Sequence, residues 1–130
     1  MGIDPPPAGE TALRIERLKK RADFLLAAKA LHCARGAVAA QARDRTDNDR
    51  LVRAGFTATR RIGGAVMRNR CKRRLREAAR ITLPLYGRAG CDYVFVARGG
   101  TLRRVWPALV DDMKSALLRL AADIDGARAL

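Results

Sequence analysis

Residues 60–80 constrain the fold of this chain more than any other stretch, because they combine a high charge with a helical apolar pattern. Nine of these 21 residues are Lys or Arg and only Glu77 is acidic, so the stretch carries +8 of the net charge of +14. Wound as an α-helix, at about 100° per residue, it brings five apolar positions within about a third of a turn. These are Met67, Cys71, Leu75, Ala78 and Ala79. The pattern predicts an amphipathic helix docked by this stripe.

The opposite side of the same helix predicts an anionic partner. Like charges at this density repel one another, and Glu77 is the one local acid that relieves them. A charge run usually means only a solvated face, but this density favours a nucleic acid, whose phosphates release counterions on binding. A membrane-surface helix would instead need bulky aromatic residues on its apolar side. On the helical wheel Asn69, Lys72, Arg73, Arg76 and Arg80 lie opposite the stripe, and Arg68, Arg70 and Arg74 flank it.

The rest of the chain predicts a mixed α/β (α+β) fold, a two-layer sandwich in which helices cover a sheet. Residues 91–97 form an almost continuous apolar run, which predicts a strand buried on both faces. Residues 51–59 alternate apolar and polar side chains and should pair as a hairpin with a weaker strand at 37–43. Helices are predicted at 23–31, after Gly63 and Gly64, and at 102–123. The expected order is therefore helix, strand, strand, helix, strand, helix.

The length of 130 residues is that of one domain. We expect a flexible N-terminal leader at 1–13, a single RNA-binding domain at 14–124 and a C-terminal tail at 125–130. No apolar run approaches the ~20 residues of a membrane span, and no secretory signal opens the chain. We therefore expect a cytoplasmic protein without a membrane partner.

Few residues of the chain could perform chemistry. His32 is the only histidine, placed by the pattern near the end of the first helix, and the three cysteines lack the paired spacing of a zinc site. Asp47 with Asp49, and Asp111 with Asp112, are acid pairs of the kind that can bind Mg²⁺. A turn accounts for the first pair, and the positive end of a helix together with solvent accounts for the second. We expect no catalytic residue and no metal site within the polypeptide alone.

Four pieces of the sequence, in order, resemble the protein subunit of bacterial ribonuclease P. The RNR signature of that family is matched at residues 60–77 by R-R-x-G-x-A-V-x-R-N-R-x-K-R-x-x-R-E. Before it come R-L-K-K-R-A-D-F at 17–24 and R-A-G-F-T-A-T at 53–59, and after it comes D-Y-V-F-V-A-R at 92–98. The resemblance covers residues 14–120, which is most of the chain.

This resemblance implies a role inside a ribonucleoprotein. Proteins of the family bind a large catalytic RNA, and the holoenzyme removes the 5′ leader from precursor tRNA. The RNA holds the catalytic Mg²⁺, so the polypeptide alone is expected to be inactive. A left-handed βαβ crossover around the basic helix is also implied, against the usual handedness. Gly63 and Val66 would open and seat the helix. The matching RNA-facing residues are Arg60, Arg61, Arg68, Asn69, Arg70, Lys72, Arg73 and Arg76.

The resemblance further implies a cleft, between the first helix and the sheet, that accepts the single-stranded leader. Phe24, Arg53 and Thr57 match this cleft, where an aromatic face and nearby cations suit unstacked bases. The chain departs from the family at Ala28, where a second aromatic residue is common, and in the small side chains at 37–40. Phe24 therefore fits the protein core as well as it fits a leader platform.

Two other functions fit a small basic chain. One is another RNA-binding role, such as that of a ribosomal protein, and the other is a DNA reader with a basic recognition helix. The order of the flanking motifs argues against the first, and the apolar strand at 91–97 argues against a compact helix-turn-helix. The expected partners are the ribonuclease P catalytic RNA and precursor tRNA with its leader, and not DNA.

Overall fold

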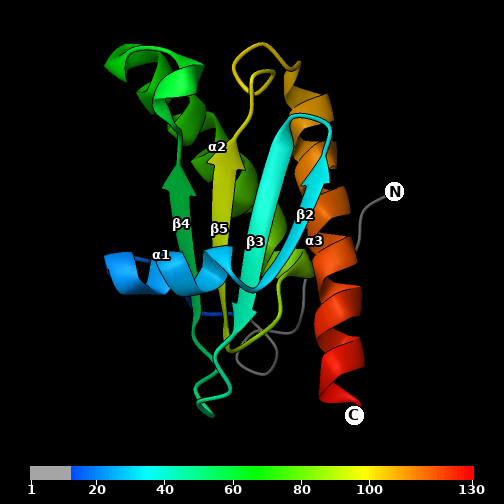
Figure 1. The fold of residues 1–130 in the computed structure, drawn as a ribbon. Coiled ribbons are helices and arrows are strands. Elements are labelled where there is room, and N and C mark those ends of the chain that lie inside the picture. The colour runs from blue at the N-terminus through cyan, green and yellow to red at the C-terminus, as the bar shows by residue number, and fades with distance from the viewer. Residues whose placement is uncertain (1–12) are drawn as a thin grey trace.

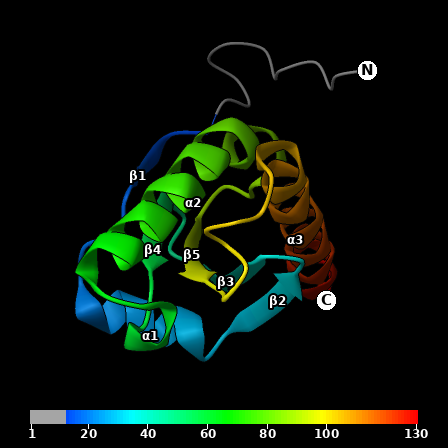
Figure 2. The same ribbon diagram turned by 90° about the horizontal axis from the view of Figure 1, so that it is seen from above.

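The computed structural model describes residues 13–130 and places two long helices against one face of a five-stranded sheet (Figure 1). A short helix crosses the other face (Figure 2). Apart from Leu13, the leader expected at 1–13 lies outside the described residues. In chain order the elements are β1 (Ile15–Arg17), α1 (Arg21–Ala28), β2 (Leu31–Arg35), β3 (Val38–Asp44), β4 (Val52–Thr57), the 3-10 turn η1 (Arg60–Ile62), α2 (Ala65–Tyr86), β5 (Cys91–Ala97) and α3 (Trp106–Arg128). The predicted mixed α+β class is confirmed.

Strand β5 lies at the centre of the sheet, whose strand order is β1-β4-β5-β3-β2. It pairs in parallel with β4 and antiparallel with β3, so both of its edges are hydrogen-bonded. Tyr93 and Phe95 pack in the cluster beneath α2 and α3, whereas Val94 packs in a second cluster with residues of α1. The prediction of a strand buried on both faces is confirmed, because this almost continuous apolar run supplies side chains to both layers.

The predicted hairpin between 37–43 and 51–59 is wrong in its pairing. Strands β3 and β4 lie on opposite sides of β5, and the hairpin partner of β3 is β2. The β2–β3 turn contains Gly36 with φ +53°, in the left-handed region that glycine adopts without strain. Because β5 is apolar apart from Asp92, its burial requires a strand on each side, and β3 and β4 take those places.

Strand β2 also corrects the first helix. Helix α1 begins at Arg21 and ends at Ala28, so Leu31, His32 and Cys33 belong to a strand and not to the predicted helix. The apolar run in this region changes from a helical period to the two-residue period of a strand, in which Cys33 is buried while His32 is exposed. The sequence pattern also missed β1, a three-residue strand too short to show an alternation.

The connection from β4 through α2 to β5 is a left-handed crossover. The two strands run parallel, and in Figure 1 the chain steps to the right from β4 to β5 while α2 passes behind the sheet. Figure 2 shows from above that α1 and α2 lie on opposite sides of the sheet. The usual right-handed crossover would place α2 on the same side as α1. The expectation drawn from the family resemblance is confirmed.

The apolar stripe of α2 packs into the main core, as predicted, along most of its length. Cys71, Leu75, Ala78 and Ala79 are buried between the helix and the sheet. Met67 is 40% exposed, because the first turns of α2 extend past the end of β4 (Figure 1). The stripe therefore fixes the rotation of α2, so that its basic side faces away from the core.

Helix α3 begins and ends later than predicted. It spans Trp106–Arg128, whereas the sequence pattern placed it at 102–123. Pro107 in the first turn explains the start, because proline fits the first helical positions, where an amide hydrogen has no partner in the helix. Residues 125–128, expected in a tail, are helical. Of the predicted apolar face, Leu109 and Leu117 are fully buried, while Trp106 remains partly exposed.

Asp112 ties α3 to two loops and is not a solvent-exposed acid, as the sequence suggested. Its carboxylate accepts hydrogen bonds from the Ala37 amide, at 2.9 Å, and from Arg104 Nε and Nη2, at 2.9 and 3.1 Å. A Cβ at Gly36 would overlap this carboxyl group. Burial by itself raises the pKa of Asp112, but the hydrogen bonds outweigh burial and hold the pKa below its ordinary value. The charged form is therefore the form that the fold selects.

Replacing Asp112 by asparagine tests this anchor. Asp112→Asn should lower the free energy of unfolding at pH 7 by about 1–2 kcal/mol, because charged hydrogen bonds become neutral ones. Most of the loss should come from the Ala37 contact, since Arg104 has a 44% exposed side chain and solvent screens it. A pKa lowered in the folded state gives stability that is present above about pH 4 and is lost as the pH falls further. The difference between the variant and the parent, from urea unfolding, should therefore shrink between pH 5 and pH 3.

The matched control for that measurement is Asp111→Asn, since Asp111 is the exposed neighbour on the same helix. It removes the same charge without touching the anchor, and it should change the unfolding free energy by less than about 0.5 kcal/mol. Equal effects of the two variants would show that Asp112 acts only through net charge.

Candidate nucleic-acid interface

The start of α2 is set by two glycines that follow η1. Gly63 has φ +142°, which L side chains rarely adopt, and a Cβ there would lie 2.8 Å from the Met67 sulfur. Gly64 is the N-cap residue, and its carbonyl accepts the Arg68 amide at 3.0 Å. The predicted role of Gly63 in opening the helix fits this geometry. Val66 was expected to seat the helix, but it is 66% exposed because it precedes the part of α2 that reaches the core.

The eight predicted RNA-facing residues all lie on η1 or α2, and none belongs to the core. Two of them, Arg68 and Lys72, are partly buried. Arg68 also donates a long hydrogen bond, 3.4 Å, to the Gly63 carbonyl, so part of its role is local. The six fully exposed members are Arg60, Arg61, Asn69, Arg70, Arg73 and Arg76.

The charges of this surface are not neutralised by neighbours. Seven of the eight residues are cations, and within the described residues none of them lies within 4.0 Å of a carboxylate. Glu77 is the one acid of α2, and it pairs with Arg80 at 3.1 Å. Because the docked stripe holds the helix rigid, these cations form a fixed positive surface. Such a surface attracts a polyanion, and its attraction falls as salt rises.

Arg74 has a structural task that the sequence did not reveal. Its guanidinium donates to the carbonyls of Thr101, Leu102 and Arg104, at 2.6, 2.8 and 2.5 Å. It also lies 5.9 Å from the centre of the Trp106 ring. Arg74 thereby fastens the loop between β5 and α3 to the basic helix. Only the position of Arg74 beside the apolar stripe, where a side chain can reach a neighbouring element, hinted at this role.

The predicted leader residues gather on the face of the sheet that α1 crosses. Arg53 and Thr57 share this face of β4, and Phe24 reaches it from α1. The Phe24 ring packs over Gly55, where a Cβ would come within 2.5 Å of it. Phe24 is partly buried against a small cluster of Leu18, Ala27 and Val94. The same ring lines a hollow together with Arg17, Lys72 and Arg76.

Arg53 is held by ion pairs inside the protein. Its Nε and Nη2 donate to the two carboxylate oxygens of Asp92, both at 2.7 Å, and its Nη1 lies 3.2 Å from Asp23. The hydrogen bonds with Asp92 raise the pKa of Arg53 above its ordinary value. Asp92 is fully buried in β5 and also accepts from Arg45 at 2.9 Å. The structural role of this acid within an apolar run was not identified from the sequence. Asp92 accepts two of the hydrogen bonds that Arg53 can donate, which leaves fewer for a ligand.

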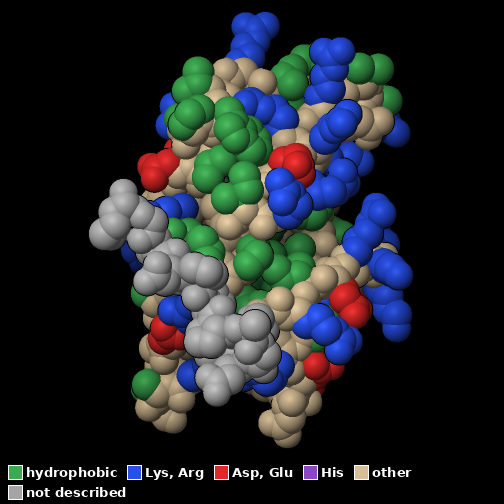
Figure 3. Space-filling view, turned by 180° about the vertical axis from the view of Figure 1, so that it is seen from behind, with side chains coloured by type: hydrophobic (Ala, Val, Ile, Leu, Met, Phe, Trp, Pro, Cys, Tyr) green, Lys and Arg blue, Asp and Glu red, His purple; other side chains and the backbone are tan. Residues whose placement is uncertain are grey.

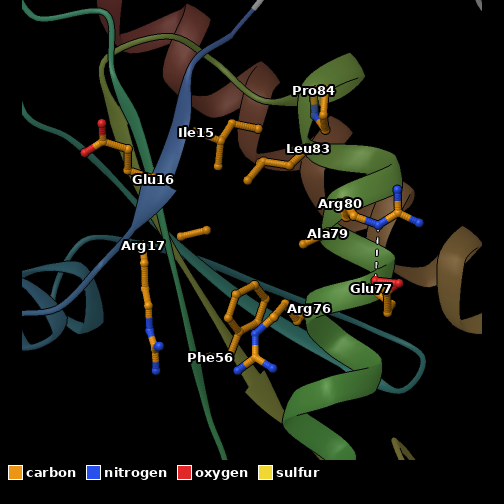
Figure 4. Close-up of a pocket in the computed structure, with 11 residues that line it drawn as sticks. Ile15, Glu16, Arg17, Phe56, Arg76, Glu77, Ala79, Arg80, Leu83 and Pro84 are labelled. Carbon is orange, nitrogen blue, oxygen red and sulfur yellow. Dashed lines mark hydrogen bonds and ion pairs between the residues drawn. The ribbon is translucent and has the colours of Figure 1, made fainter.

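A groove runs beside α2 on its β1 side, as Figure 4 shows. Its volume is about 490 Å³, and apolar side chains from β1, β4 and α2, among them Ile15, Phe56 and Leu83, form its floor. The Arg76 guanidinium lies 5.5 Å from the centre of the Phe56 ring. Arg17, Phe56 and Arg76 line both this groove and the hollow at Phe24, so the two form one trench. Aromatic and apolar surface beside unpaired arginines suits unstacked bases and their phosphates.

The residues considered for catalysis are not assembled into a site. His32 is exposed on β2, and Asp47 and Asp49 lie in the turn after β3, where Arg45 donates to Asp47 at 2.9 Å. Within residues 13–130, no three His, Cys, Asp or Glu side chains come close enough to hold a metal ion. Over the same residues, no helix has the length and apolar character needed to cross a bilayer.

Comparison with known proteins agrees with this geometry. The sequence model of the ribonuclease P family matches residues 13–121. The ribonuclease P protein component of Caulobacter vibrioides is 66% identical over 113 residues, which cover 87% of this chain and 76% of that protein. The protein of the same name from Ruegeria pomeroyi is 47% identical over 110 residues, which cover 83% of this chain and 88% of that protein.

Solved structures share the fold. The RNase P protein from Thermotoga maritima has a TM-score of 0.66 and 25% identity, over 79% of this chain and 96% of that one. The Staphylococcus aureus RNase P protein has a TM-score of 0.64 and 24% identity, over 78% of this chain and 91% of that one. This second match supports the likeness of fold alone. The matched family residues include all of α2 and its exposed cations. The chain therefore belongs to the ribonuclease P protein component family.

Proposed function

We propose that this protein is the RNA-binding subunit of ribonuclease P and assists the catalytic RNA in removing the 5′ leader of precursor tRNA. The observation that carries the proposal is the set of seven predicted RNA-facing cations on η1 and α2, none of which has a carboxylate within 4.0 Å among the described residues. A rigid helix with this charge is costly unless phosphates lie against it. The family match favours this role over that of a ribosomal protein or a DNA reader.

The catalytic RNA binds along the exposed side of α2. Arg70, Arg73 and Arg76 are its clearest contacts, because all three are exposed and none has a carboxylate within 4.0 Å in the described chain. Arginine forks suit phosphate oxygens, and the fixed helix keeps the forks in place without further ordering. This surface reduces the repulsion between phosphates of the RNA where the substrate approaches.

The leader of the precursor tRNA lies in the trench between α1, β4 and α2. Phe24 supplies an aromatic face there, and Arg17 and Arg76 supply cations beside it. Thr57 is partly exposed on the same face of the sheet and can donate or accept one hydrogen bond. Arg53 contributes mainly by holding the sheet through Asp92, with its remaining exposed edge toward the leader.

Catalysis belongs to the RNA in this proposal. Mg²⁺ is bound mainly by RNA phosphates, since the described residues offer no cluster of metal ligands, and no step is assigned to a metal held by the protein. The polypeptide positions both RNAs, and it acts in the cytoplasm, where precursor tRNA is made. The chain alone is therefore expected to leave precursor tRNA intact.

Removing one exposed cation should weaken assembly in a salt-dependent way. Arg70→Ala should lower the affinity for the catalytic RNA and reduce the slope of log Kd against log salt by about 0.7–0.9, the contribution of one phosphate contact. Filter binding between 50 and 300 mM salt measures the slope. Arg70 is a better choice than Arg68, because Arg68 also bonds the Gly63 carbonyl.

Arg119→Ala is the matched control, because it removes the same charge from an exposed arginine of α3 that pairs with Asp123. Its slope should equal that of the parent protein. An unchanged slope for Arg70→Ala would remove Arg70 from the contact surface.

Removing the aromatic ring of Phe24 should affect the leader alone. Phe24→Ala should weaken holoenzyme binding of leader-bearing precursor tRNA by about five-fold or more, the loss expected for one base stacked on an aromatic ring. Mature tRNA, which lacks the leader, should bind as before. The ratio of the two affinities is the measured quantity.

Val94→Ala controls for the loss of packing, since Val94 is buried in the same small cluster but does not line the hollow. It should leave that ratio unchanged. Equal losses of both RNAs for Phe24→Ala would assign Phe24 to the core instead.

A further inference from the structure

A second hollow lies on the other side of α2, between this helix and the start of α3. Its volume is about 510 Å³. Apolar groups on its lining are Trp106, Ile81 and Leu102. Four arginines and one acid border them, namely Arg70, Arg73, Arg74, Arg80 and Glu77. Figure 3, which looks at the molecule from behind, shows apolar side chains gathered between basic ones on the upper part of this face. None of the sequence motifs pointed to this place.

The apolar floor of the hollow is exposed. Trp106 is 39% exposed and Ile81 is 41% exposed, although both side chains are of a kind that proteins usually cover. Trp106 opens α3 and lies outside the main core, so its ring is not needed to fill the space beneath the sheet. An exposed indole next to an aliphatic side chain is a surface that gains from contact with another flat apolar group.

The position of the indole is fixed before any partner arrives. Arg74 lies against the ring and anchors the loop before α3 with three hydrogen bonds to carbonyl groups. Pro107 follows the tryptophan and limits the backbone at the first turn. A preorganised ring loses little entropy on binding, so contact with it gives more affinity than contact with a mobile side chain.

The border of the hollow selects a polyanion. Arg70 and Arg73 have no carboxylate within 4.0 Å in the described chain, and Arg80 has only Glu77, in an exposed pair. An apolar protein surface would have to desolvate these cations without compensation. A nucleotide offers a flat base for the indole and a phosphate for the arginines, so it satisfies both parts of the hollow.

We propose that this hollow binds an unpaired nucleotide of the catalytic RNA, with its base packed on Trp106 and its phosphate held by Arg70 or Arg73. This inference rests on the proposed function, because it takes that RNA as the partner. Arg70 and Arg73 already belong to the surface assigned to the catalytic RNA. The leader trench borders the β1 side of α2, whereas this hollow lies on the α3 side of the same helix. The catalytic RNA is therefore the RNA that we assign to the hollow, and the leader is the alternative that the test must separate.

The tryptophan itself is the probe, because the chain contains only one. The fluorescence of the full-length protein is titrated with ribonuclease P RNA, and in a separate arm with a short oligonucleotide of leader sequence. We expect the catalytic RNA to quench the fluorescence, with the same midpoint concentration that filter binding gives. The leader oligonucleotide should cause little quenching. Quenching by the leader oligonucleotide alone would overturn the choice of RNA.

Two variants separate stacking from charge. Trp106→Leu should weaken binding of the catalytic RNA by about five-fold or more, while Trp106→Phe, which keeps an aromatic face, should stay within about three-fold of the parent. Stacking releases no counterions, so the salt slope of Trp106→Leu should equal that of the parent, unlike that of Arg70→Ala. Leu118→Ala removes an exposed apolar side chain elsewhere on α3 and should change neither affinity nor slope.

These experiments separate the nucleotide site at Trp106 from the proposed function of the whole protein. If the parent protein binds the RNA with unchanged fluorescence, and Trp106→Leu binds equally well, the nucleotide site is wrong and the proposed function stands. If the parent protein fails to bind the catalytic RNA at all, the proposed function is wrong as well. Thermal unfolding of each variant confirms that a loss of affinity comes from a folded protein.

Discussion

The rest of the structure depends on a buried carboxylate at the centre of the sheet. Asp92 is fully buried in β5, receives both Arg53 bonds from β4 at 2.7 Å, and receives Arg45 from the end of β3 at 2.9 Å. It therefore connects the three inner strands at the register position where Arg53 lies beside Asp92 in the parallel pair of β4 and β5. With these strands adjacent and α1 on one face, α2 must cross the other face, which is where its cations are presented. Breaking such a buried pair costs about 3–5 kcal/mol, because it leaves a charge without a partner.

Helix α2 packs into the core with one side and presents its cations on the other. Its apolar stripe, with Leu75 at the middle, is buried against the sheet and α3, and this contact holds the helix at one rotation. Its outer side then presents arginines that repel one another, and in the proposed function the phosphates of the RNA reduce this repulsion. Arg74 differs from the other cations of α2, because its guanidinium bonds to the loop before α3 and lies near the Trp106 ring at the end of that loop.

The features that the sequence predicted are those that depend on neighbouring residues. The stripe of α2 and the apolar run of β5 follow from local periodicity, and the exposed position of most α2 arginines follows from the same helical period. The pairing of β3 with β5 and the ion pair between Arg53 and Asp92 join residues far apart in the chain, which no local pattern reports. The anchor at Asp112 and the exposed Trp106 were missed for the same reason, because both looked like ordinary positions of one helix. The predicted hairpin between β3 and β4 was wrong because the buried strand β5 lies between them, and the order of strands in a sheet is not visible in the local sequence pattern.

In the proposed function, the protein supports a reaction that an RNA performs. The most direct measurement is cleavage of a precursor tRNA at low Mg²⁺ by the protein alone, by a bacterial ribonuclease P RNA alone, and by the two together. We expect accurate 5′ cleavage only in the mixture, because the cations of α2 then replace part of the Mg²⁺ that the RNA otherwise needs to screen its phosphates. Cleavage by the protein alone, or a mixture no more active than the RNA, would contradict it.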